Sequence, residues 1–128
     1  NVLIAGNVAG DQDSDCEIVG TGSSLVSLGH NLIQTSGAGC VISGDTGSNL
    51  LNVDPLLGAR SLSSGMPIQA PGLAGPAVNA IPLPQCADAG SFGVFSDSRG
   101  VRRPNGSNTS CDIGALEIEF PLLADGFE

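Results

Sequence analysis

The chain has 128 residues, enough for one domain with a buried core. It holds 19 glycines and 8 prolines, has no lysine, tryptophan or tyrosine, and carries a formal net charge of −9. That charge opposes binding to nucleic acid or to an anionic membrane, and no stretch is apolar for long enough to cross one. We therefore expect a turn-rich all-β protein with no nucleic-acid partner and no membrane insertion.

Residues 1–7 read as a short buried strand that ends at an asparagine corner. The strand Asn1-Val2-Leu3-Ile4 begins directly at the first residue. Coiled β proteins normally cap such an end, because an open coil exposes its core. We expect either a C-terminal piece of a longer precursor or a subunit whose open end meets another molecule.

An acidic loop follows, with Asp11, Asp13 and Asp15 at alternate positions as in a calcium loop. The EF-hand pattern then fails, because Cys16 stands at the glycine position and Gly22 at the position of the bidentate glutamate. A solvated acidic corner is the favoured interpretation. Ca²⁺ at these three aspartates is the weaker alternative, and no other cofactor is expected.

Four cysteines in an acidic, lysine-free chain indicate an oxidising compartment, and their spacing does not suit zinc. Four cysteines allow three pairings. We favour Cys16–Cys40 and Cys86–Cys111, because residues one repeat apart in a coil lie on neighbouring strands about 4.8 Å apart. That separation suits a disulfide.

A loose repeat of twenty-odd residues runs through the chain, which is typical of a solenoid. Four asparagines recur at intervals of this length, although the intervals are not identical. Asparagine tolerates the backbone of a corner, and stacked asparagines hydrogen-bond from coil to coil. We therefore expect Asn7, Asn31, Asn52 and Asn79 to form a corner series.

The second half contains more proline, and residues 59–85 are interpreted as Pro/Gly-rich loops that wrap the coil. No segment has a clear helical apolar stripe, and hairpin Asn-Gly turns are almost absent. Parallel strands closed into a coil therefore fit better than a sandwich. The expected architecture is a short parallel β-helix over residues 1–119 with a tail over 120–128.

Charged residues gather near the end of this expected coil. The spacing of Asp97, Arg99 and Asp112 predicts an ion-paired clasp that locks the last loop onto the coil beside Cys86–Cys111. The alternative is that Arg102 and Arg103 bind an acidic sugar. His30, the single histidine, is interpreted as a corner residue in preference to a general base.

Four ordered motifs resemble the C-terminal region of secreted bacterial β-helix proteins with a choice-of-anchor Q domain. The motifs span roughly residues 16–119 and are Ser27-Leu28-Gly29-His30-Asn31-Leu32-Ile33, Val53-Asp54-Pro55-Leu56-Leu57-Gly58, Asp97-Ser98-Arg99-Gly100-Val101-Arg102-Arg103-Pro104 and Cys111-Asp112-Ile113-Gly114-Ala115-Leu116-Glu117. The resemblance implies a right-handed parallel β-helix exported to the cell surface or medium. It supplies no catalytic residues. The chain departs from the pattern at Ser98 and Asn79.

Together these features predict a secreted structural protein, not an enzyme, that stacks head to tail into an extracellular filament or surface layer. The partner would then be a second copy of the chain. The expected self-assembly residues lie at the two ends of the chain, namely Asn1, Val2, Leu3, Ile4, Phe120, Leu122 and Phe127. The alternative is a glycan-binding or carbohydrate-active module cleaved from a larger β-helix protein.

Overall fold

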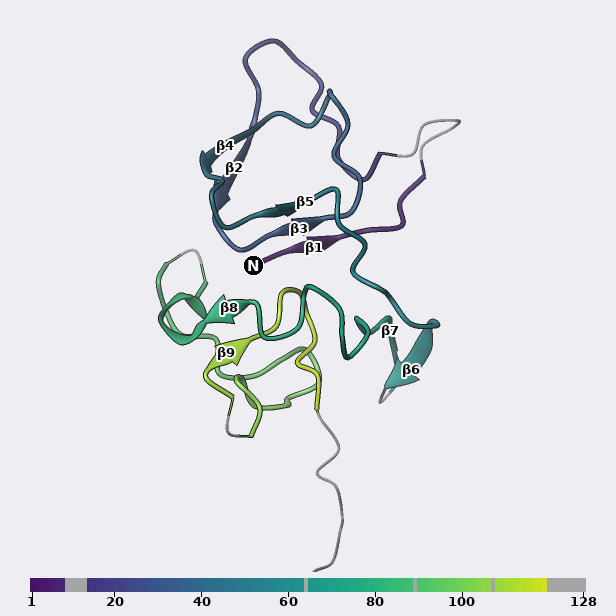
Figure 1. The fold of residues 1–128 in the computed structure, drawn as a ribbon, viewed down its shortest axis with the longest axis vertical. Helices are drawn as coiled ribbons and strands as arrows, with labels where there is room; N and C mark the ends of the chain where they lie inside the picture. The colour runs from purple at the N-terminus through teal and green to yellow at the C-terminus, as the bar shows by residue number, and fades with distance from the viewer. Residues whose placement is uncertain (9–13, 64, 89, 107, 120–128) are drawn as a thin grey trace, which may run out of the picture.

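The computed structural model describes residues 1–8, 14–63, 65–88, 90–106 and 108–119. These residues form nine short strands and one 3₁₀ turn, arranged in four small sheets with no α-helix. The fold is therefore mostly β, as expected (Figure 1). Within these ranges there is no helix of the length and apolarity that a membrane span requires.

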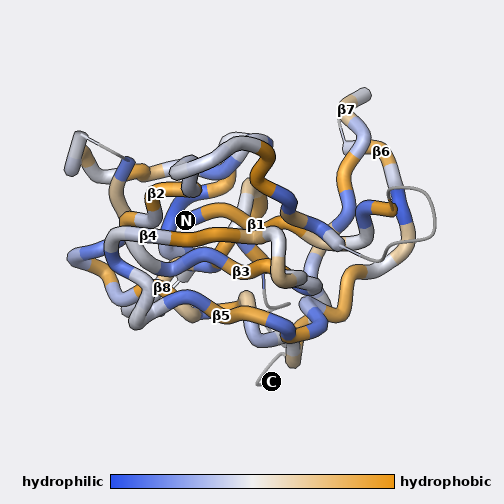
Figure 2. The backbone as a smooth tube through the Cα atoms, turned by 90° about the horizontal axis from the view of Figure 1, so that it is seen from above, coloured by the Kyte–Doolittle hydropathy of each residue, from blue (hydrophilic) through white to orange (hydrophobic). Residues whose placement is uncertain are grey.

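Residues 1–53 build two parallel sheets. The first contains β1 (Leu3–Ile4), β3 (Leu32–Ile33) and β5 (Leu50–Leu51), with β3 in the middle. The second pairs β2 (Leu25–Leu28) with β4 (Ile42–Asp45). Figure 2 shows β1, β3 and β5 as successive rows with hydrophobic residues along each. This half therefore has the parallel pairing that the sequence predicts.

Successive passes of the chain in this half lie in register. The second and third passes are joined by β2–β4 and β3–β5 pairing. The first and second are joined by β1–β3 pairing and by the parallel bridge between Cys16 and Ser36. At the corner between the two sheets, Asn31 and its hydrogen-bonded partner Asn49 are 18 residues apart in the sequence. Val2 and Asn31, which join the first pass to the second, are 29 residues apart. The repeat between the two complete passes is thus shorter than the expected twenty-odd residues.

Glycine permits the tight corners between these passes. Gly29 follows β2 with a φ of +89°, and a Cβ there would lie 2.6 Å from the Ser48 hydroxyl. Gly44, inside β4, has a φ of +81°, and its Cβ would meet the carbonyl oxygen of Ser27 on β2. A side chain at either site would both strain the backbone and separate the passes.

The pairing changes to antiparallel after residue 56. β6 (Ser61–Ser63) pairs with β7 (Met66–Ile68), and β8 (Ile81–Pro82) pairs with β9 (Ser110–Cys111). The 3₁₀ turn Leu83–Gln85 follows β8, and three antiparallel bridges join the remaining loops. The parallel pairing expected over residues 1–119 is therefore confined to the first half. No solenoid or closed sheet is detected among the described residues.

One hydrophobic core joins the two halves. Leu32 of β3 is fully buried together with residues of the second half, namely Ala77, Ile81, Cys86, Cys111 and Ile113. Leu3 and Leu50, the sheet partners of Leu32, pack against the same cluster. The parallel sheet thus rests on the C-terminal half and is held in place by shared apolar burial.

Candidate functional site

Both disulfides favoured from the sequence are present. Cys16 bonds to Cys40 in the parallel half, with 5.1 Å between the Cα atoms. Cys86 bonds to Cys111 in the C-terminal half, where both residues belong to the core, with 6.1 Å between the Cα atoms. Two such bonds indicate an oxidising compartment.

The C-terminal half contains a buried ionic cluster, here called the clasp, made of Asp97, Arg99, Arg103, Asp112 and Glu117. Arg99 Nη2 lies 2.7 Å from Asp97 Oδ2, which is the ion pair that the sequence predicts between these two residues. Asp97 also accepts the main-chain N–H groups of Arg99, Val101 and Glu117. Its carboxylate therefore holds the turn at residues 97–101 and also the segment that contains Glu117.

A second ion pair in the clasp joins Arg103 to Glu117. Arg103 Nε lies 3.0 Å from Glu117 Oε2, and its Nη2 donates to the carbonyl oxygens of Asp112 and Gly114 at 2.8 Å each. Glu117 is completely buried and accepts the N–H of Asn105 and of Asp112. Arg103 is therefore occupied inside the protein, which counts against the alternative that it binds an acidic sugar.

Asp112 lies in the clasp, but it does not pair with Arg99 as its spacing predicted. Its two carboxylate oxygens instead accept the N–H groups of Asn79 and Ile118. Asp112 is 1% exposed. The correction has a physical reason, because three buried carboxylates must share two guanidinium groups, and main-chain donors satisfy the third.

The surroundings move the pKa values of two clasp carboxyls in opposite directions. Burial favours a higher pKa for Asp97, but hydrogen bonds from the Glu117 N–H, the Arg99 side chain and two further N–H groups hold its pKa below the ordinary value. Burial raises the pKa of Asp112, and the nearby Glu117 charge adds to this rise against the bonds from Asn79 and Ile118. Folding thus lowers the pKa of Asp97 and raises the pKa of Asp112.

A neutral polar column joins the passes of the parallel half, and only one member of the expected asparagine series belongs to it. The Asn31 side chain accepts the N–H of Val2 at 2.9 Å and donates to Asn49 Oδ1 at 3.1 Å. Asn49 donates to the buried hydroxyl of Ser27 at 2.9 Å. The column therefore runs from Val2 through Asn31 to Asn49 and Ser27.

The other members of the series make separate contacts. Asn52 Oδ1 accepts the N–H of Ser36, Asn7 donates to Asp15, and the N–H of Asn79 donates to Asp112. Asn52 and Asn79 do have the positive φ expected at corners, at 59° and 52°. The series is therefore not a stacked ladder. The reason is the shorter repeat of this corner, which brings Asn49 and not Asn52 onto Asn31.

The sequence contained signals for the residues that spacing arguments missed. Gly29-His30-Asn31-Leu32-Ile33 recurs in similar form as Gly47-Ser48-Asn49-Leu50-Leu51, which identifies Asn49 as the partner of Asn31. Glu117 stands between the apolar residues Leu116 and Ile118 and ends the last quoted motif. No sequence signal indicated that Ser27 would be the buried hydroxyl.

Two further candidates, the acidic loop at Asp11, Asp13 and Asp15 and the single histidine His30, stand outside these clusters. Asp11 and Asp13 lie outside the described residues, and Asp15 accepts hydrogen bonds from Asn7 and from the Thr35 N–H. Within the described ranges no three His, Cys, Asp or Glu residues are grouped as a metal site would need. His30 occupies the corner after β2 with a φ of 51°, and its N–H donates to the Ser48 hydroxyl.

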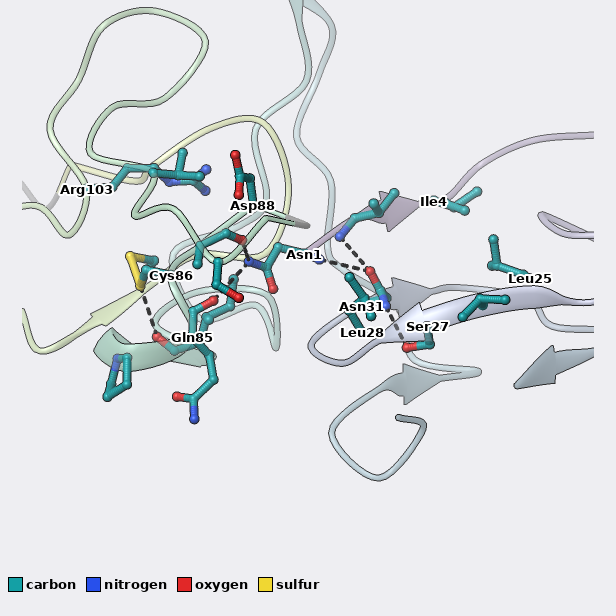
Figure 3. A pocket seen from close by; sticks show the side chains of 18 of the residues that line it. Asn1, Ile4, Leu25, Ser27, Leu28, Asn31, Gln85, Cys86, Asp88 and Arg103 are labelled. Atoms are coloured by element: carbon teal, nitrogen blue, oxygen red, sulfur yellow. Dashed lines mark hydrogen bonds between the residues drawn. A yellow bond between two sulfur atoms is a disulfide. The ribbon is translucent and has the colours of Figure 1, made fainter. Parts of the chain in front are cut away.

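A cavity of about 730 Å³ lies between the two halves (Figure 3). One wall is formed by Asn1, Val2, Ile4, the corner at Asn31 and all four residues of β2. The other is formed by residues 84–88, Ser91, Val94 and Arg103. The side chain of Asn1 crosses between the walls and donates to the carbonyl oxygens of Gln85 and Ala87 at 3.1 and 3.0 Å. The cavity is therefore bounded by an open sheet edge and is mixed in polarity.

The expected self-assembly residues are divided between the cavity and the core. Asn1, Val2 and Ile4 line the cavity, whereas Leu3 packs against the shared core. Phe120, Leu122 and Phe127 lie outside the described residues. Asn1, Val2 and Ile4 thus line the same cavity as the residues of β2.

Comparisons with known proteins found no matching family model, no matching curated protein and no matching solved structure. The resemblance to the choice-of-anchor Q domain therefore rests on the four sequence motifs.

Proposed function

We propose that this chain is a structural β-sheet protein of the cell surface or extracellular medium that associates head to tail with further copies of itself. The observation that supports this is the open edges of the parallel sheets. β1 and β5 are the edge strands of one sheet, and β2 and β4 make up the whole of the other. Such edges offer main-chain donors and acceptors to a strand of another molecule.

We further propose that residues 1–53 are turns of a right-handed parallel β-helix. Two parallel contacts between each pass and the next support this, as does the Asn31–Asn49 column. A coil with two different ends joins copies through unlike surfaces. Contacts of that kind build a filament when the rotation between copies does not close a ring.

The clasp supports a structural role over an enzymatic one. Its carboxylates and guanidinium groups bond to one another and to main-chain groups, so they fix loops in place. Every buried side-chain nitrogen and oxygen described has a hydrogen-bond partner. Charged groups committed in this way are poorly placed to bind or protonate a substrate.

The proposal is tested by sedimentation velocity over a wide concentration range, followed by negative-stain electron microscopy with and without reductant. We expect concentration-dependent association and regular fibres, which reductant should weaken because it opens both disulfides. Discrete monomers at every concentration would contradict self-association.

A second candidate function, binding of a glycan, is favoured by two observations. Phe92 and Phe95 are 74% and 78% exposed on one loop, and aromatic faces are common in sugar sites. The cavity supplies a concave surface with polar groups. Affinity electrophoresis in gels containing neutral or acidic polysaccharides tests this function. Retardation that Phe92→Ala and Phe95→Ala both abolish would support it, and unchanged mobility in every gel would exclude it for those polysaccharides.

A further inference from the structure

We propose that the cavity beside β2 receives residues 120–124 of a second copy, Phe-Pro-Leu-Leu-Ala, as a strand added to the edge of β2. This inference rests on the self-association proposed above and names the surface and segment that carry it. Three features of the cavity support it: an incomplete sheet, main-chain groups on the side of β2 away from β4, and exposed apolar side chains on that edge.

The β2–β4 sheet has two strands, one fewer than the β1–β3–β5 sheet that it adjoins. β3 follows β2, and β5 follows β4, across corners of three and four residues. β1 adds a further strand beside β3, but no described strand lies beside β2 at the same level. A vacant position for one strand therefore exists along β2, and all four β2 residues line the cavity there (Figure 3).

The main-chain groups along this edge are available for pairing. The N–H of Leu25 donates to Val41, and so Leu25 and Ser27 face β4. Because main-chain groups of successive strand residues point to opposite sides, those of Val26 and Leu28 face the vacant position. By this alternation the N–H groups of Val26 and Leu28 point away from β4. A strand of about four residues, roughly 13 Å long, would pair with this edge.

The side chains at the edge fit an uncharged apolar segment. Val26 and Leu28 are each 67% exposed, and Leu25 is 37% exposed. Residues 120–124 carry no charge and include Phe120, Leu122 and Leu123. Burial of this surface against such a segment is favourable at about 25 cal/mol per Å².

The position of Pro121 specifies the register. Proline lacks an N–H, so it is tolerated in an edge strand only where that position faces away from the partner. With Pro121 outward, the N–H groups of Phe120, Leu122 and Ala124 face β2. The outward Pro121 then discourages addition of a further strand at this site.

A second copy supplies this segment because the described chain ends far from β2. In Figure 1 the chain reaches its described C-terminal end (yellow) at the lower right of the C-terminal half, whereas β2 lies in the parallel half at the top. The N–H of Ile118 donates to Asp112, and the N–H of Glu117 donates to Asp97. The residues just before the segment are therefore anchored in the clasp. The segment of one copy thus meets the open edge of the next, which is a head-to-tail contact.

The test uses the full chain and two pairs of matched variants. Leu122→Pro removes an N–H that faces β2, whereas Leu123→Pro changes an outward position. Val26→Lys places a charge at the receiving edge. Its control, Val19→Lys, places the same charge at an exposed valine that does not line the cavity. We expect Leu122→Pro and Val26→Lys to raise the dissociation constant of self-association about tenfold or more, and both controls to change it less than about twofold.

Hydrogen exchange locates the contact. The amides of Val26 and Leu28 should exchange more slowly as the concentration of the chain rises, and a peptide of residues 118–126 in excess should protect them while dispersing assemblies. Equal association of Leu122→Pro and Leu123→Pro would overturn the inference while leaving self-association intact. Protection at every concentration would assign the edge to the chain's own segment and also overturn it. If the chain stays monomeric, the proposed function fails, and binding of the peptide at Val26 and Leu28 decides the receiving site alone.

Discussion

The buried polar side chains are neutral in residues 1–53 and charged in residues 57–119. In the first half, Ser27 is buried and bonds to the amides of Asn31 and Asn49. In the second half, Asp97, Asp112 and Glu117 are buried and bond to two arginines and to main-chain N–H groups. This difference arises because the backbone is regular in the first half and irregular in the second.

A repeating backbone needs only a small polar column. Parallel passes in register satisfy one another's main-chain groups, and an amide that both donates and accepts links each pass to the next. The irregular loops of the second half leave N–H groups without strand partners. Ionised carboxylates accept several of these at once, and arginine bonds to the carbonyl oxygens and balances the charge.

The largest expected effect comes from breaking the Arg103–Glu117 pair. Glu117→Ala should destabilise the fold by about 3–5 kcal/mol, because it leaves a buried guanidinium and two main-chain N–H groups unpaired. Urea unfolding followed by circular dichroism measures the loss. Glu119→Ala, at an exposed neighbouring position, is the control and should cost less than about 0.5 kcal/mol. Similar losses in both variants would contradict a structural role for the clasp.

Removing the Cys86–Cys111 disulfide should have the next largest effect. The bond joins cysteines at a sequence separation of 25, and its replacement by two alanines should cost about 3.5 kcal/mol through the unfolded chain. The matched comparison is Cys16–Cys40, at a separation of 24 and outside the shared core. Because the two loops are alike, any excess loss at Cys86 and Cys111 measures their packing in the core. Thermal unfolding of both double variants gives the values.

Asn31→Asp should have a smaller effect on the parallel half. The substitution keeps the acceptor for Val2 but replaces the donor to Ser27 and Asn49 with a carboxylate oxygen, at a cost of about 1–3 kcal/mol. Urea unfolding measures the change. A loss below about 0.5 kcal/mol, as at an ordinary surface position, would show that the polar column contributes nothing beyond an ordinary corner.

The pH dependence should be the smallest effect, because two carboxyls of the clasp oppose each other. The pKa of Asp97 is lowered on folding, so its stabilisation is complete above the unfolded value of about 3.9 and is lost as pH falls through its folded pKa. The pKa of Asp112 is raised, so its contribution is greatest below about 3.9 and declines as pH rises through its folded pKa.

Variants separate these two contributions. Asp112→Asn should make the unfolding free energy increase more steeply with pH on the acid side, and Asp97→Asn should flatten or reverse that increase. Urea unfolding from about pH 2.5 to 7 measures both slopes. Identical slopes in the two variants would show that the carboxyls do not titrate in opposite senses.

Local sequence features were sufficient to predict the β class, both disulfides and the Asp97–Arg99 pair. Short apolar runs between glycines and prolines exclude long helices. Both disulfide pairings are present, although the passes repeat at 18 residues and Cys111 lies in an antiparallel pair, so the repeat length from which they were predicted is not the one observed. Asp97 and Arg99 are close neighbours in the chain, so a single turn brings them together. The β class and the Asp97–Arg99 pair depend on local features of a short stretch.

The tertiary structure decided what depended on register and packing. The sequence repeat Gly-His-Asn-Leu-Ile to Gly-Ser-Asn-Leu-Leu was present, but pairing β3 with β5 made Asn49 the partner of Asn31. Packing of β8 against β9 brought Asn79 to Asp112, and folding of the last loop gave Glu117 to Arg103. Composition and spacing cannot specify such partners, because many acceptors compete for each donor until the backbone fixes their distances.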